Sequence, residues 1–158
     1  MKSLRSFFPL LLVPIVATFA HAQKGKAVNV TVPQELEATL FSPNTLTPCV
    51  ACIGVAPTGE VYAGVDQIGS LGKGGGKGKI IRLIDADHDG ISETHTVYAV
   101  IDNPRGIVPV GDKLYVLHTK WGQGTQFDGM FLSVLTDANG DGKADGPPKH
   151  LVKEISTR

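Results

Sequence analysis

The sequence has 158 residues, and its 15 basic and 15 acidic side chains give a formal net charge of zero. A near-neutral chain excludes a protein that binds nucleic acid mainly through charge, because such binding needs a basic surface. Nineteen glycines and ten prolines exclude a helical bundle and favour strands joined by turns.

The first 22 residues have the pattern of a secretion signal. Lys2 and Arg5 form a basic start, residues 7–20 are mostly apolar, and Ala20-His21-Ala22 fits a small-x-small cleavage site. The apolar run is too short, and too interrupted by prolines, to span a membrane in the mature protein. We therefore expect an exported protein, periplasmic or on the cell surface, whose mature part is the remaining 136 residues.

Two short segments within residues 23–46 predict N-terminal strands. Residues 28–32 and 36–41 contain β-branched side chains in partial alternation, and Pro33 separates them. We expect residues 36–41 to pair away from their sequence neighbours, for instance by completing the last sheet of a closed ring.

The rest of the sequence repeats itself. Residues 80–85 return as 131–137, and residues 95–101 return as 149–155. A unit of about 50 residues with four strand-like runs is the pattern of a β-propeller blade. The repeat therefore predicts an all-β fold with two four-stranded blades.

The predicted blades are residues 47–102 and 103–158. Their strands begin near Pro48, Val61, Ile80 and Thr96 in the first blade, and near Pro104, Leu114, Phe131 and His150 in the second. A propeller needs four to eight blades, and two isolated sheets would leave apolar faces exposed. We therefore expect an N-terminal fragment of a larger propeller; the alternative is a complete small domain of two sheets.

Two acidic nonapeptides at equivalent places in the repeats are the strongest functional signal. We name residues 85–93 the first acidic loop and residues 137–145 the second. Each has oxygen-bearing side chains at positions 1, 3, 5 and 9 and a glycine at position 6. Ca²⁺ takes six to eight hard oxygen ligands from such a loop, and without a cation the clustered carboxylates would repel one another.

The predicted metal ligands are eight side chains and two main-chain carbonyls. They are the side chains of Asp85, Asp87, Asp89, Glu93, Asp137, Asn139, Asp141 and Asp145, and the carbonyls of Ile91 and Lys143. Mg²⁺ suits so many ligands less well. The first acidic loop has four carboxylates against three in the second, so we expect it to bind calcium more tightly.

The flanks of these loops distinguish them from an EF-hand. An EF-hand has a glutamate at position 12, where this sequence has Thr96 and Pro148, and helices on both sides, where this sequence predicts strands. We expect a calcium loop within a β-hairpin, with a structural role. The alternative is that each Asp-Gly pair only makes a polar turn.

The opposite end of the blades holds three candidate substrate-binding residues. Arg105, His118 and Trp121 are predicted to lie near the connections that lead into the inner strand and from the second strand to the third. The alternatives are that Trp121 packs in the structure, that Arg105 neutralises Asp102, and that His118 bonds a backbone group.

Two further motifs give weaker predictions of function. Residues 72–79 are rich in glycine and lysine, but they lack the serine or threonine of a phosphate-binding loop, so we expect a flexible connection. Cys49 and Cys52 are followed by Ile53 where a c-type haem site needs histidine. They are expected to be buried free thiols, or a redox pair only if the strand is distorted.

Several of these stretches together resemble one family, the membrane-bound dehydrogenases predicted in planctomycetes and verrucomicrobia. The likeness covers most of the mature chain. It rests on residues 32–41, the strand after Pro48, and residues 69–72, 85–93, 103–106, 114–118 and 137–145. That family is similar to the glucose/sorbosone dehydrogenases that use pyrroloquinoline quinone.

The resemblance implies a periplasmic oxidoreductase for a sugar or alcohol. It implies transfer of electrons through the quinone to a cytochrome c domain or another electron carrier, with haem bound only in a C-terminal domain outside this sequence. The acidic-loop positions match the family, whereas no catalytic residue is assigned. The alternatives are a non-catalytic calcium-binding propeller that recognises glycans or proteins at the cell surface, and an isolated calcium-loop module.

Overall fold

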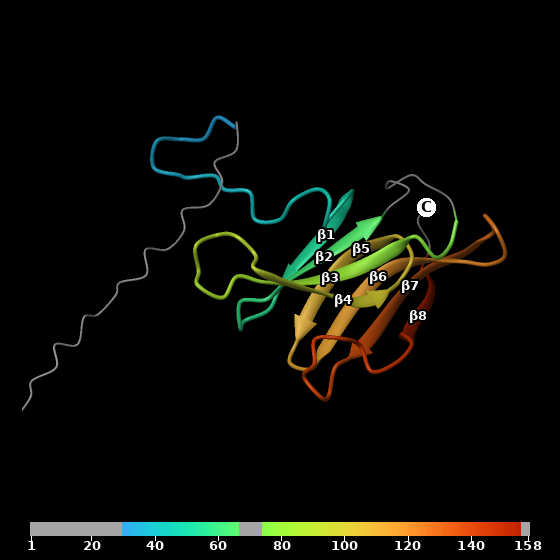
Figure 1. The fold of residues 1–158 in the computed structure, drawn as a ribbon. Coiled ribbons are helices and arrows are strands. Elements are labelled where there is room, and N and C mark those ends of the chain that lie inside the picture. The colour runs from blue at the N-terminus through green and yellow to red at the C-terminus, as the bar shows by residue number, and fades with distance from the viewer. Residues whose placement is uncertain (1–29, 67–73, 156–158) are drawn as a thin grey trace, which may run out of the picture.

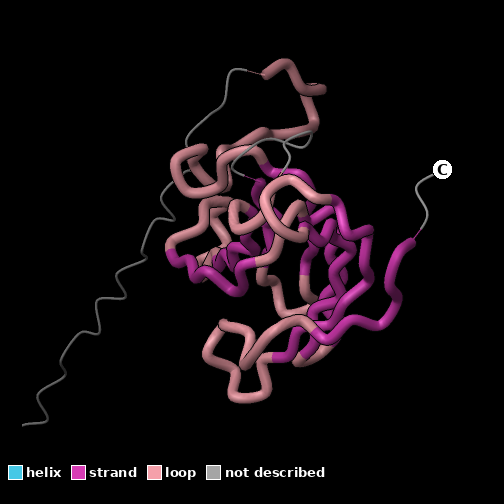
Figure 2. Tube along the Cα trace, turned by 90° about the vertical axis from the view of Figure 1, so that its right-hand side faces the viewer, coloured by secondary structure: helices cyan, strands magenta, loops and turns pink. Residues whose placement is uncertain are grey.

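The computed structural model describes residues 30–66 and 74–155. The predicted signal sequence and residues 67–73 lie outside this part of the chain. The described residues contain eight strands and no helix (Figure 2). The strands are β1 (Val50–Val55), β2 (Val61–Asp66), β3 (Gly78–Ile84), β4 (Thr94–Val100), β5 (Pro104–Val110), β6 (Lys113–Trp121), β7 (Phe127–Thr136) and β8 (Lys149–Ile155).

The eight strands form two four-stranded antiparallel sheets, β1-β2-β3-β4 and β5-β6-β7-β8 (Figure 1). Each strand pairs only with its sequence neighbours, so both sheets are simple meanders. The predictions of an all-β fold and of four strands per repeat are confirmed.

The antiparallel order puts alternate connections at opposite ends of each sheet. The turns β1–β2 and β5–β6 lie at the same end as the two acidic loops, which connect β3 to β4 and β7 to β8. We call this the acidic-loop end. The connections β2–β3, β4–β5 and β6–β7 lie at the opposite end.

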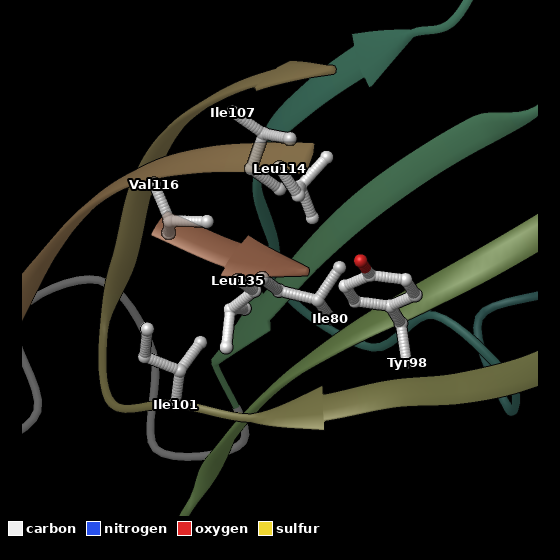
Figure 3. Close-up of a cluster of buried hydrophobic side chains, with 7 residues drawn as sticks. All are labelled: Ile80, Tyr98, Ile101, Ile107, Leu114, Val116 and Leu135. Atoms are coloured by element: carbon white, nitrogen blue, oxygen red, sulfur yellow. The ribbon is translucent and has the colours of Figure 1, made fainter. Parts of the chain in front are cut away.

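A hydrophobic core fills the space between the two sheets (Figure 3). The first sheet and the connection after it contribute Ile80, Tyr98 and Ile101. The second sheet contributes Ile107, Leu114, Val116 and Leu135, all at most 6% exposed. Burial of such a side chain stabilises a fold by about 1.5–3 kcal/mol, so this layer holds the sheets together.

The first strands of the two sheets approach each other closely. A Cβ atom placed on Gly54 in β1 would lie 2.7 Å from the carbonyl oxygen of Ile107 in β5. One on Gly64 in β2 would lie 2.9 Å from Cβ of Pro104. The glycines of the first repeat therefore allow β5 to lie against β1 and β2.

The prediction of N-terminal strands is wrong for the described residues. Val28 and Asn29 lie outside the described part, and residues 30–49 form turns and irregular chain, with one isolated bridge residue at Thr39. Leu36 is 62% exposed and Leu40 is 38% exposed. A strand needs a neighbour for its backbone hydrogen bonds, and residues 36–41 have none in either sheet.

Candidate functional site: two acidic loops

The first acidic loop gathers its four predicted side-chain ligands. Ligand oxygens of Asp85, Asp87, Asp89 and Glu93 all lie within 4.8 Å of one another. No other group of three or more His, Cys, Asp or Glu side chains comes together in this way within residues 30–66 and 74–155, so the carboxylates of the second acidic loop, Asp137, Asp141 and Asp145, are not gathered as closely. The structure therefore concentrates negative charge at the place that the sequence predicted.

Main-chain amides hold these carboxylates in position. Asp85 accepts hydrogen bonds from the N–H groups of Asp89, at 3.1 Å, and Gly90, at 2.9 Å. Asp89 accepts one from Ile91 at 2.8 Å, and Glu93 reaches back to the N–H of Ala86 at 2.6 Å. Each carboxylate oxygen has two lone pairs, so these bonds orient the groups and leave acceptor capacity for a cation.

The second acidic loop repeats this pattern bond for bond. Asp137 accepts from the N–H groups of Asp141, at 3.1 Å, and Gly142, at 2.9 Å. Asp141 accepts from Lys143 at 2.9 Å, and Asp145 accepts from Ala138 at 2.8 Å. Two loops 52 residues apart thus have the same local hydrogen-bond network.

The backbone conformation is also the same in both loops. Position 6 has a positive φ, 86° at Gly90 and 80° at Gly142, as the sequence predicted for a sharp turn. Position 4 has a positive φ too, 61° at His88 and 71° at Gly140. The positive φ at position 4 was not predicted from the sequence, although the glycine at position 140 indicates it.

The two loops differ in charge. The first acidic loop carries four carboxylates, whereas the second has three, with Asn139 at position 3 and the cationic side chain of Lys143 at position 7. The Arg82 guanidinium also lies beside the second loop, since a Cβ on Gly142 would be 2.8 Å from its Nη1 atom. A cation is therefore attracted more strongly to the first loop.

The donor set fits a hard divalent cation. Carboxylate, amide and carbonyl oxygens are the ligands that Ca²⁺ uses, and no sulfur or imidazole group belongs to the predicted sets. Ile91 and Lys143, whose carbonyl groups are predicted ligands, directly follow the turn at position 6.

Arg82 forms an ion pair that the sequence did not reveal. Its Nη2 atom donates to Glu60 Oε1 at 2.8 Å. The pair lines a cavity of about 440 Å³ at the acidic-loop end, together with Tyr62, Tyr98 and Asp137. A charged pair from the first sheet therefore lies next to the second acidic loop.

At the opposite end, the three candidate substrate-binding residues do not form one pocket. His118 and Trp121 line a hollow of about 240 Å³, but Arg105 is not among its lining residues. Trp121 donates its indole N–H to Asn103, whose amide donates to the buried Asp66. Trp121 is therefore anchored by the fold.

His118 belongs to a buried hydrogen-bond relay. Its Nδ1 lies 3.0 Å from the carbonyl oxygen of Thr119, which can only accept, so Nδ1 carries the proton. Its Nε2 then accepts from the Ser133 hydroxyl at 2.9 Å, and Ser133 accepts from Nδ1 of His150 at 2.8 Å. Burial lowers the pKa of His118 and of His150, so the relay favours neutral imidazoles.

Both cysteines are free thiols. The prediction that the thiols are buried is wrong for Cys49, which is exposed where the chain enters β1 with a φ of 50°, and Cys52 lies half-buried in β1. Burial raises the pKa of the Cys52 thiol to about 11, so it stays protonated and unreactive at neutral pH. Of the glycine-rich stretch at 72–79, residues 72 and 73 lie outside the described part of the chain.

Comparison with protein-family models, curated proteins and solved structures found no match. Within the residues that the structure describes, no helix is long and apolar enough to cross a membrane.

Proposed function

We propose that this chain provides two adjoining blades of a β-propeller and that each acidic loop binds one Ca²⁺ ion. The observation that carries the proposal is the duplicated loop. The two loops share positions in their sheets, positive φ values at positions 4 and 6, and the same amide–carboxylate bonds.

The arrangement of the sheets supports the propeller. Each sheet is a four-stranded meander, and the inter-sheet contacts concentrate between β5 and the first two strands of the other sheet. In a propeller, the first strand of every blade lines the central axis, so first strands of adjacent blades are neighbours. A closed ring would also cover the apolar side chains that these two sheets leave exposed.

The proposed role of the ions is structural. The second acidic loop contacts the first sheet, because the N–H of Ala144 donates to the carbonyl oxygen of Tyr98 at 2.9 Å. The first acidic loop contacts the preceding segment, because the N–H of Ser92 donates to the carbonyl oxygen of Phe41 at 3.0 Å. An ion that rigidifies each loop would therefore fix the contact between neighbouring elements.

Thermal unfolding with and without calcium tests the proposal. We expect Asp87→Asn and Asp141→Asn to lower the melting temperature in calcium and to leave it unchanged in chelator. Calcium at about 100 times its dissociation constant stabilises a folded chain by about 2.7 kcal/mol per site, so the loss is measurable. Asp112→Asn is the control, because Asp112 lies outside both loops in an exposed pair with Lys113. Equal losses with and without calcium would refute the ligand assignment.

We further propose, from the family resemblance, that the propeller belongs to a periplasmic quinoprotein-type dehydrogenase for a sugar or alcohol, with cytochrome c as electron acceptor. Trp121 is the only tryptophan in the sequence and lies at the proposed substrate end. Because the proposal gives this sequence only two blades of the ring, the two blades alone are not expected to be active and the assay uses the complete propeller. Addition of pyrroloquinoline quinone and calcium to the complete propeller should change the fluorescence of Trp121 and allow sugar-dependent reduction of a dye. No change in either signal in the complete propeller would contradict this proposal.

The alternative is a non-catalytic propeller that recognises glycans or proteins at the cell surface. The structure favours it because both ring nitrogens of His118 and the indole N–H of Trp121 already bond protein groups, so these atoms are not free to exchange protons with a substrate. A glycan array probed in calcium separates the two functions: binding without dye reduction supports recognition.

A further inference from the structure

One asparagine of the chain is followed by a glycine. The asparagines are Asn29, Asn44, Asn103 and Asn139, and only Asn139 precedes a glycine, Gly140. In such a pair, the backbone nitrogen of the second residue can attack the side-chain amide carbon of the first. The attack closes a five-membered ring and expels ammonia. Glycine favours this reaction because it has no Cβ atom that hinders the approach.

The second acidic loop directs the Asn139 amide toward that nitrogen. The N–H of Asp141 donates to Asn139 Oδ1 at 3.0 Å. This bond closes a turn in which the side chain of the asparagine folds over the peptide that contains the Gly140 nitrogen. The same bond polarises the amide carbonyl group, and a donor in this position stabilises the negative oxygen that forms during the attack.

The surroundings of the pair leave room for the reaction. Asn139 and Gly140 are both exposed, and a Cβ on Gly140 would meet no atom of the described residues within 4 Å. Gly140 has a φ of 71°, and glycine can change this angle without a steric penalty as the ring closes. Solvent water therefore has access to the ring once it forms.

Asn103 lacks each of these features. It is 1% exposed, its amide donates to Asp66, and its side-chain oxygen accepts from the indole N–H of Trp121. The next residue is Pro104, whose nitrogen carries no hydrogen that it could lose. The Asn103 side chain is therefore held in place, and its neighbour cannot attack it.

Asn44 is exposed like Asn139 and provides an internal comparison. It is followed by Thr45, whose β-branched side chain crowds the backbone nitrogen. The amide two residues after Asn44, that of Leu46, donates to the carbonyl oxygen of Pro43 at 2.9 Å. The Asn44 side chain therefore lacks the hydrogen bond that activates Asn139.

We propose that Asn139 is a site of spontaneous deamidation. The Gly140 nitrogen loses its proton and bonds to Cγ of Asn139, while the bond from Cγ to Nδ2 breaks and this nitrogen leaves as ammonia. Water then opens the ring at either of its two carbonyl carbons, which gives aspartate or isoaspartate at position 139. The reaction consumes one water, releases one ammonia and changes no oxidation state.

The two products change the second acidic loop in opposite ways. Aspartate at position 139 gives this loop carboxylates at positions 1, 3, 5 and 9, as in the first acidic loop. Isoaspartate adds a methylene group to the main chain between positions 3 and 4, which displaces the N–H groups of Asp141 and Gly142 from Asp137. The effect on calcium binding rests on the function proposed above, whereas the deamidation does not.

Peptide mass spectrometry of the whole chain, incubated in chelator at mildly alkaline pH, tests the reaction. The mass gain of amide-to-acid conversion should appear at Asn139 about tenfold faster, or more, than at Asn44 in the same sample. Gly140→Ala should slow the conversion of Asn139 by a similar factor, because its methyl group hinders the attack. An Asn139 that reacts no faster than Asn44 would overturn the proposal.

A comparison with the unfolded wild-type chain tests the role of the loop, and it holds even if Gly140→Ala does not fold. The folded loop keeps the Asn139 amide against the Gly140 nitrogen, so we expect the folded chain to react at least as fast as the chain in urea. A slower reaction in the folded chain would show that the loop protects the amide, and would overturn the proposal.

Calcium titration of the products separates this proposal from the calcium-binding proposal. Asn139→Asp reproduces the aspartate product and should bind the ion of the second acidic loop about threefold more tightly, or more, because one more carboxylate faces the ion. The isoaspartate form, separated by chromatography, should lose that site. Absence of calcium binding in every form would overturn the calcium-binding proposal alone, whereas an unreacted Asn139 would overturn the deamidation alone.

Discussion

Glycine at position 6 of the second acidic loop is required for two independent reasons. Gly142 has a φ of 80°, which disfavours any side chain, and its Cα faces the Arg82 guanidinium at close range. The Arg82–Glu60 ion pair holds that guanidinium in place. A Cβ at position 142 would strain the loop backbone, and the flexible end of the Arg82 side chain would have to shift to make room for it.

We therefore expect Gly142→Ala to destabilise the chain by about 1–3 kcal/mol, from backbone strain and the displaced Arg82. Gly146→Ala is the matched control, because a Cβ there meets no atom within 4 Å and its φ is not positive. Urea unfolding in chelator measures both variants without the contribution of metal. Equal stabilities for the two variants would contradict the structure of this turn.

At the level of elements, the close approach of β1 and β5 depends on Gly54. We expect Gly54→Ala to cost about 1–3 kcal/mol, because its Cβ would lie 2.7 Å from a backbone oxygen of Ile107 that cannot rotate away. Gly106→Ala in β5 is the control, since its Cβ would make only an ordinary contact, 3.8 Å from Leu117. Chemical denaturation should give a lower free energy of unfolding for Gly54→Ala than for Gly106→Ala. A Gly54→Ala variant as stable as the wild type would contradict the packing of the sheets.

The relay across β6, β7 and β8 predicts a pH dependence of stability. Burial lowers the folded-state pKa of His118, so the unfolded chain binds more protons than the folded chain. The contribution of neutral His118 to the free energy of unfolding should therefore be fully present above the unfolded pKa of about 6.5. It should fall as the pH drops below that value, by up to about 1.4 kcal/mol per pH unit for one proton.

Urea unfolding between pH 7.5 and 5.5 in saturating calcium tests this relay. His118→Gln should be less stable at pH 7.5, and its stability should fall less steeply as pH decreases. His95→Gln is the control, because His95 is exposed on β4 and should retain the wild-type slope. The prediction fails if the His118→Gln slope equals that of the wild type.

At the scale of the whole molecule, features that repeat were predictable from the sequence. The two acidic loops correctly marked the ends of β3 and β7, and the strand order follows from the same comparison. The starts of the four strands that flank the loops lie earlier than predicted, at Gly78, Thr94, Phe127 and Lys149. Features that depend on non-local contacts were not. Residues 36–41 have strand-like composition, but their described surroundings lack a pairing partner, and composition carries no information about that neighbour.

The candidate site shows the same division. The candidate ligands of each acidic loop could be predicted from the sequence because they lie within nine consecutive residues. The alternative that His118 bonds a backbone group is confirmed by its contact with the carbonyl oxygen of Thr119. The bonds of His118 with Ser133, of Ser133 with His150 and of Arg82 with Glu60 were not predicted, because these partners are distant in the sequence. Trp121 was selected as a substrate-binding residue, yet the structure ties its indole to Asn103, a residue 18 positions earlier in the chain.

Isothermal titration of the whole chain with calcium tests the duplicated cation site most directly. Two ions per chain are expected, with tighter binding in the first acidic loop, and one remaining site in Asp87→Ala and in Asp141→Ala alike, because alanine removes the ligand oxygen. The tighter site should be the one lost in Asp87→Ala, whereas Asp87→Asn should weaken the first site toward the affinity of the second acidic loop, which has Asn139 at the same position. Binding of no calcium, or heats that neither alanine substitution alters, would contradict the duplicated cation site.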